Sequence, residues 1–190
     1  MTINRNYQNL VNKLEEISYL NGVMCTLGWD QEVVMPSGAS EARAQQIAAL
    51  AGVIHERMTD TQLGECLFAL QEESDCVLNV LQRCNIHEAQ RDFDLETKIP
   101  KQLVMEMAAL GSRAHISWVK AREDNKFSHF APMLKQFLEL KKEWAQCAFP
   151  NLSPYDENMD ILEYQLIKSD NAFSEFLETL EEGKSISLSY

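Results

Sequence analysis

The sequence predicts an all-α protein with six or seven helices, and three observations support this fold class. Seven Gly and five Pro make up 12 of the 190 residues, about half the usual share of the residues that end helices. Leu, Glu and Ala, which favour helices, supply 58 residues. Apolar residues also recur every three or four positions along most of the chain.

An apolar stripe that begins at Tyr7 predicts a first helix from about Tyr7 into the mid-twenties. Pro36 and Gly38 then predict a break in the helix, because Pro and Gly together stop a helix and redirect the chain. The following apolar face consists mainly of small side chains, which permit close contact between helices. This second helix carries Ala44, Ile47, Ala48, Ala51 and Ile54.

The third predicted helix begins at a capping box and ends near Glu73. Thr59 and Gln62 have the spacing at which both side chains bond free backbone amides at a helix start. Ser74 is a candidate cap for a fourth helix that runs towards Lys98. Pro100 ends this fourth helix, because a proline disfavours the α conformation in the residue before it.

Three more helices are predicted in the second half of the chain. Apolar spacing indicates a fifth helix over residues 103–121, followed by a polar turn at 122–126, and a sixth helix over 130–144. A short last helix is predicted over 173–180. Periodicity is lost in residues 183–190. We therefore expect one helical region over 1–182 and a disordered or aberrant tail over 183–190, as an early end of the reading frame would produce.

The net charge of −12 argues against several kinds of partner. A strongly negative chain repels nucleic acids and anionic membrane surfaces, so we expect neither as a partner. The charge is uneven, since residues 151–190 alone carry −7. This segment is interpreted as a solvated acidic surface, with contact to a basic partner as the alternative.

Several features of the sequence predict a cytoplasmic protein. The residues from Met1 to Tyr7 do not resemble the start of a secretory signal, and the longest run of apolar residues and Gly, Ile47 to Ile54, is far too short to span a membrane. The five cysteines are odd in number and include no CxxC pair. This pattern indicates reduced thiols that serve as small core residues.

Two His-Glu pairs begin a zinc-peptidase motif but do not complete it. In HExxH, histidines four residues apart on one helix face bind zinc and the Glu acts as general base. Thr59 stands where the second histidine should follow His55, and Arg91 stands where it should follow His87. Both pairs are therefore interpreted as His–Glu pairs on exposed helix faces. The spacing rules also exclude a di-iron bundle, which needs ExxH on two helices.

One stretch of the sequence carries a more specific signal. Leu27-Gly-Trp-Asp-Gln-Glu-Val-Val-Met-Pro-Ser-Gly38, followed by Glu41-Ala-Arg-Ala-Gln-Gln46, resembles the N-terminal region of the carboxypeptidase Taq family of metallocarboxypeptidases. The resemblance spans roughly residues 7–180. Further similar segments are Ile54-His-Glu56, Glu88-Ala-Gln-Arg-Asp92, Pro100-Lys-Gln-Leu-Val104, Ser112-Arg-Ala-His115, Phe127 to Pro132 and Pro154-Tyr-Asp156.

The resemblance implies an antiparallel helical array with a deep substrate groove, a cytosolic location and frequent homodimers. Family members remove C-terminal amino acids from peptides with one divalent ion, usually zinc or cobalt. Their ligands lie on an HExxH helix and a downstream Glu, beyond the region matched here. We therefore assign no catalytic, cofactor-binding or metal-binding residue to this chain and expect it to bind no cofactor.

The chemistry of the matched residues indicates roles in the fold of this region. We expect Trp29 to be a core or groove-wall aromatic, and Asp30 to cap backbone amides or pair with Arg43. The alternative is that one residue among Trp29, Asp30, Gln31 and Arg43 touches substrate across the groove in an intact enzyme. The structural family motif consists of Trp29, Asp30, Gln31, Met35, Pro36 and Arg43.

Two functions are compatible with these observations. The first is the N-terminal fragment of a metal-dependent carboxypeptidase, inactive alone because HExxH is absent and dependent on a C-terminal half. The second is a stand-alone acidic helical module that binds a partner or forms a homo-oligomer. Bound metal with peptide turnover, or a defined complex without metal, would separate the alternatives.

Overall fold

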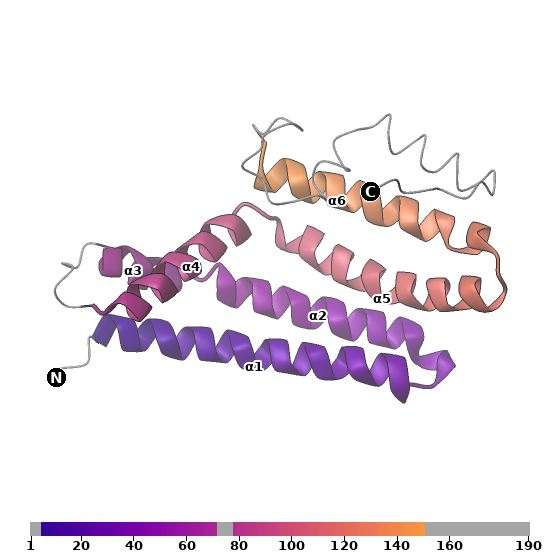
Figure 1. Cartoon of the computed structure of the whole chain (residues 1–190), viewed down its shortest axis with the longest axis horizontal. Coiled ribbons are helices and arrows are strands. Elements are labelled where there is room, and N and C mark those ends of the chain that lie inside the picture. Colours follow the sequence, from indigo (N-terminus) through magenta and orange to yellow (C-terminus); the bar gives the residue numbers. More distant parts are fainter. Residues whose placement is uncertain (1–4, 72–77, 151–190) are drawn as a thin grey trace, which may run out of the picture. The chain divides into compact units, whose positions relative to one another are not determined.

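The computed structural model describes residues 5–71 and 78–150, and this part of the chain is helical and contains no strand (Figure 1). The predicted all-α class is confirmed. The predicted helix over 173–180 and the tail over 183–190 lie outside the described residues. The elements are α1 (Arg5–Val33), η1 (Ser37–Ala39), α2 (Ser40–Met58), α3 (Thr61–Gln71), α4 (Val80–Glu96), α5 (Lys101–Glu123), η2 (Phe127–His129) and α6 (Ala131–Ala148).

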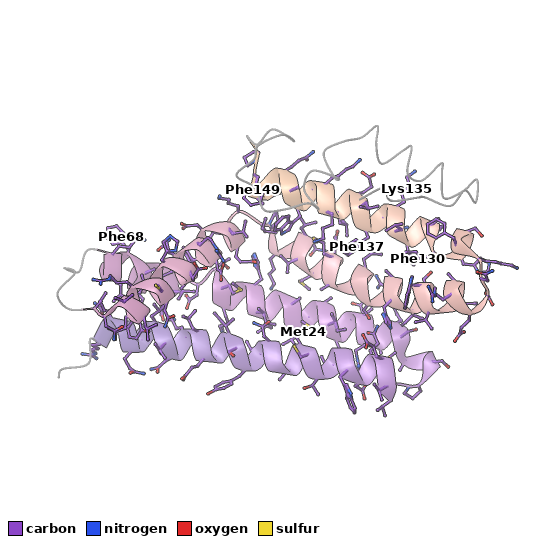
Figure 2. All side chains as sticks on the ribbon, viewed as in Figure 1. Met24, Phe68, Phe130, Lys135, Phe137 and Phe149 are labelled. Atoms are coloured by element: carbon purple, nitrogen blue, oxygen red, sulfur yellow. The ribbon has the colours of Figure 1, made fainter. Side chains whose placement is uncertain are left out.

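The chain divides into two compact units, residues 1–108 and 109–190, with the boundary inside α5. In the first unit α1 and α2 run antiparallel and side by side, while α3 packs against α1 and α4 (Figure 1). Met24 points from α1 towards α2 (Figure 2). The buried core of this unit consists of Leu10, Ile17, Ile54, Leu63, Leu67, Leu70, Leu78, Ile86 and Ala89.

Helix α1 continues to Val33, well beyond the predicted end in the mid-twenties. A single Gly such as Gly28 costs a helix only about 1 kcal/mol, which α1 tolerates where no Pro accompanies it. The combination of Pro36 and Gly38 does stop it, as predicted. Although α1 has 29 residues, neither it nor any other described helix is apolar enough along its length to cross a membrane.

The predicted capping box between α2 and α3 is wrong. Thr59 instead closes α2, where both its backbone N–H and its hydroxyl donate to the carbonyl of His55, at 2.9 and 2.8 Å. Asp60 begins α3, because its carboxylate accepts from the backbone N–H of Gln62 at 3.1 Å. Asp and Thr are both good caps, and the choice depends on where α2 ends.

A capping box does begin α4, five residues after Ser74, the predicted cap. Asn79 accepts from the backbone N–H of Gln82, and the Gln82 side chain accepts from the backbone N–H of Asn79, each at 2.9 Å. The two bonds satisfy amides that a helix start leaves free. Ser74 itself lies outside the described residues.

The second unit contains the end of α5, η2 and α6. Helix α5 stops where predicted, because Asn125 adopts a left-handed conformation with φ of 50°. Lys126 then donates to the carbonyl of Ala121 at 2.9 Å, and Asn125 donates to that of Arg122 at 3.2 Å. This pair of bonds is a Schellman motif, which satisfies the last carbonyls of a helix.

The described thiols are all free. Cys66 and Cys147 are half-buried, but Cys25 and Cys84 are exposed on α1 and α4. The expectation that cysteines act as core residues is therefore wrong for Cys25 and Cys84. Each lies on a side of its helix that the other described elements leave uncovered.

Candidate functional site

The family motif lies at the corner where α1 ends and α2 begins, and Arg43 is its central residue. Its guanidinium donates from Nη2 to Oδ2 of Asp30 and from Nη1 to the carbonyl oxygen of Leu27, both at 2.5 Å. Its Nε donates to Oε1 of Gln46 at 3.0 Å. The predicted pair of Asp30 and Arg43 is therefore present, and it joins α1 to α2.

Asp30 also shapes the turn through its backbone. Its carbonyl oxygen accepts from the N–H groups of Val34 at 3.0 Å and Met35 at 2.8 Å, which closes the last turn of α1. Pro36 is extended, with φ of −60° and ψ of 142°, and its carbonyl accepts from Ala39 at 2.9 Å. Met35 and Pro36 thus lie where the chain leaves one helix and enters the next.

Trp29 is 59% exposed, so the expectation of a core aromatic is wrong. The described elements leave most of the indole uncovered. The other interpretation, an aromatic on the wall of a substrate groove, stays a prediction. Gln31 is half-buried at the same corner.

His55 is buried, contrary to the expectation that it forms an exposed pair with Glu56. Its Nε2 lies 3.1 Å from the carbonyl oxygen of Glu96 and 3.9 Å from the Glu96 carboxylate. Glu56 instead accepts from Nζ of Lys101 at 2.6 Å. The partner of His55 comes from the end of α4, forty-one residues later, and nothing in the local sequence indicates that contact.

Burial raises the pKa of the Glu96 carboxyl above its usual value of 4.5. The positive field of His55 opposes this rise, and the negative charge of Asp92 adds to it. Removal from water favours the neutral form of a carboxyl group. The contact between His55 and Glu96 therefore joins α2 to α4, and it includes a carboxyl group whose pKa is raised.

His87 behaves as predicted. It lies on the exposed side of α4, and its Nδ1 is 3.5 Å from the carboxylate of Glu88. Arg91, which stands in the position of the missing zinc ligand, pairs with the same Glu88 at 2.8 Å. A cation at this point of the helix face is incompatible with a zinc ion held by His87.

The residues described do not fit a catalytic metal. Nowhere in 5–71 or 78–150 do three or more His, Cys, Asp or Glu side chains gather closely enough to hold an ion. His55 and Glu96 supply only two donors, and one ring nitrogen is engaged with a backbone carbonyl. The corner around Arg43 is an ion-paired junction between helices, in which the Asp30 carboxylate is held by the Arg43 guanidinium.

The chain belongs to the carboxypeptidase Taq (M32) metallopeptidase family, whose characteristic sequence matches residues 9–186. The motif at the corner between α1 and α2 is the part of the sequence that predicted this family. The match extends on both sides of that corner, so the shared pattern includes the helices as well as the motif.

Two curated relatives show how much of such a protein this chain represents. Thermostable carboxypeptidase 1 of Thermus thermophilus is 36% identical over 169 residues, covering 85% of this chain and 33% of the relative. Carboxypeptidase 1 of Bacillus subtilis is 27% identical over 169 residues, covering 88% and 34%. The chain therefore spans about a third of the length of the relatives that it matches.

A solved structure shares the fold. The crystal structure of BsuCP superimposes with a TM-score of 0.77 over 94% of this chain and 35% of that one. Sequence identity over this match is 24%. The arrangement of helices found here is thus also the arrangement of a part of a larger protein.

Proposed function

We propose that this chain is the N-terminal helical part of a metal-dependent carboxypeptidase, an enzyme that removes C-terminal amino acids from peptides. The observation that carries the proposal is the extent of the family match. It covers residues 9–186 of this chain, yet the alignments with the two curated carboxypeptidases cover only about a third of each of them.

The chain is proposed to be inactive alone. Its sequence contains no HExxH, the element that would supply two histidine ligands and a general base. The described residues offer no alternative ligand set. In the complete enzyme a divalent ion, zinc or cobalt, would polarise the peptide carbonyl and activate water, held by residues outside this chain.

The motif corner is proposed to serve the fold of that enzyme. Arg43 donates hydrogen bonds to Asp30, Leu27 and Gln46 within this chain. Its guanidinium therefore joins two helices. A substitution at Arg43 is therefore proposed to reduce stability while leaving turnover per folded molecule unchanged in a complete relative.

The free thiols and the charge of −12 support a cytoplasmic location without nucleic-acid partners. Peptide is the proposed substrate of the complete enzyme only. A homo-oligomer is compatible with the exposed apolar residues on α1.

Purified chain tests the proposal of inactivity. It is incubated with zinc or cobalt, freed of excess ion, and assayed for bound metal by mass spectrometry and for release of C-terminal amino acids from a peptide. We expect no stoichiometric metal and no turnover. One ion per chain with turnover would overturn the proposal, and a defined metal-free complex with another protein would favour an interaction module.

A further inference from the structure

The second half of α1 has an exposed face without charges. Residues 17–29 contain no Asp, Glu, Lys or Arg, although they make nearly four turns of helix. At 100° per residue, five side chains of this range share one side, and three of them are exposed by 70% (Tyr19), 51% (Val23) and 59% (Trp29). Asp30, the next residue, lies on the same side and is paired with Arg43 of α2. We call Tyr19, Gly22, Val23, Thr26 and Trp29 the outer face of α1.

A helix face in water normally carries charged residues. Helix α4 does so, since its exposed positions include His87, Glu88 and Arg91, which form ion pairs with one another. The inner side of α1 is apolar for a clear reason, because Leu10, Ile17 and Met24 pack against the core. The outer face has no such neighbour among the described elements, and Figure 2 shows its end of α1 bearing side chains that project away from α2.

The composition of the outer face is that of a protein interface. The core of an interface is depleted of charge, and aromatic residues there contribute most of the binding energy. Gly22 leaves open space, because a Cβ placed on it would meet nothing within 4 Å. The hydroxyl of Thr26 donates to the carbonyl of Gly22 at 3.0 Å, so its methyl group is available for apolar contact.

We propose that the outer face of α1 is the surface on which the remaining two thirds of the carboxypeptidase packs. The inference rests on the proposed function, because it takes its partner from the relatives, of which this chain covers 33% and 34%. Their remaining length must pack around this third, and an uncharged apolar stripe is the surface that such packing buries. The face has no Lys or Arg with which to attract nucleic acid or an anionic membrane.

Thiol protection tests this inference. Thr26→Cys places a probe at the centre of the outer face, and native Cys84, exposed on α4, is the internal control. The variant is studied as the isolated chain and as a chimera in which it replaces the matching third of the Thermus carboxypeptidase. In the chimera the introduced thiol should react with iodoacetamide at least tenfold more slowly than in the isolated chain, with the Cys84 rate unchanged.

Equal rates in both forms would overturn the inference. Protection of the introduced thiol in the isolated chain would also overturn it. Protection only at high protein concentration would indicate a second copy of the chain, and protection at all concentrations would indicate another part of the same chain. A metal-loaded chimera without turnover would count against the proposed function, while its thiol rates would still decide the inference. A second format needs no fusion. The separately purified remainder of the Thermus enzyme is added to the isolated variant chain, and it should lower the reaction rate of the introduced thiol without changing that of Cys84. If the introduced thiol is protected in neither format, the proposal is contradicted.

A charge on the outer face supplies an independent measurement. Val23→Asp should leave the melting temperature of the isolated chain nearly unchanged and lower that of the chimera by several degrees, because only the chimera buries the new charge. His87→Asp, at an exposed position on α4, should change neither. A chimera that is unaffected by Val23→Asp would contradict the proposal.

Discussion

Arg43 illustrates how a single side chain can hold two helices together. Its three donor atoms bind a carboxylate, a backbone carbonyl and an amide oxygen, and the acceptors come from both α1 and α2. The guanidinium is only 12% exposed, whereas the Asp30 carboxylate is 34% exposed. The planar guanidinium of Arg can donate to several acceptors in different directions, whereas the single ammonium group of Lys cannot replace it in this geometry.

Arg43→Ala should lower the free energy of unfolding by about 2 kcal/mol, because it leaves a part-buried carboxylate and a carbonyl without their donor. Urea unfolding measures this change. Arg91→Ala is the matched control, since its ion pairs are exposed and should contribute less than about 1 kcal/mol. Equal, small effects of both substitutions would contradict the structural role of Arg43.

Glu96 gives the molecule a predicted pH dependence. Because its pKa is raised in the folded chain, the folded state keeps this proton to higher pH than the unfolded state does. The stability that this group contributes is present below its usual pKa of 4.5 and is lost as the pH rises through the raised value. Glu96→Gln stays neutral, so its stability relative to the parent should increase as the pH rises from about 4.5 towards neutrality.

Glu56→Gln is the control with the opposite sign. A hydrogen bond from Lys101 lowers the pKa of Glu56, so that group contributes stability above 4.5 and loses it as the pH falls. Its glutamine variant should therefore lose stability relative to the parent at neutral pH. Urea unfolding across this pH range measures both, and parallel curves for Glu96→Gln and the parent would contradict a raised pKa of Glu96.

At this scale the sequence predicted local contacts and missed distant ones. Asp30 and Arg43 were paired correctly because they flank one turn, so their side chains share a corner. His55 was expected beside Glu56, its neighbour, but its partner is Glu96, forty-one residues away. Trp29 was expected in the core or on a groove wall, since an indole buries a large area. It is exposed instead of buried in the core, because burial depends on which elements cover that side of α1.

At the scale of elements, sequence periodicity predicted the helices well and their ends poorly. Apolar spacing found α2, α5 and α6, because a buried stripe extends over many residues and tolerates local exceptions. A cap depends on one or two residues, and Thr59, Asp60, Ser74 and Asn79 are all good caps by type. The structure uses Asp60 and Asn79, whose side chains meet free backbone amides.

Close packing between α3 and α4 makes a further prediction. A Cβ added to Gly64 would lie 2.7 Å from Cζ of Phe93, whose ring packs against the core. Gly64→Ala should therefore destabilise the chain by about 1–3 kcal/mol, as overpacking of a core does. Gly22→Ala is the control in the isolated chain, where open space lets the better helix former add up to about 1 kcal/mol.

Thermal or urea unfolding of both glycine variants checks this prediction. Opposite signs for the two substitutions are expected, since they have the same chemistry and differ only in their surroundings. A stabilised Gly64→Ala variant would show that α3 and α4 do not approach as closely as the contact with Phe93 requires.

At the scale of the whole molecule, the described residues form helices, helix junctions and a core, without the ligand set of a metallopeptidase. The family match nevertheless runs along most of the chain and over about a third of its curated relatives. The packing proposed for the outer face of α1 would account for both observations. A surface of this kind is expected where the remainder of an enzyme packs.

The most direct test of the central claim is the activity of a chimera. The matching third of the Thermus carboxypeptidase is replaced by this chain, and the purified product is assayed for bound zinc or cobalt and for release of C-terminal amino acids. If this chain is the N-terminal part of such an enzyme, the chimera should hold one ion per chain and show metal-dependent turnover. A folded, metal-loaded chimera that releases no amino acid would contradict the claim.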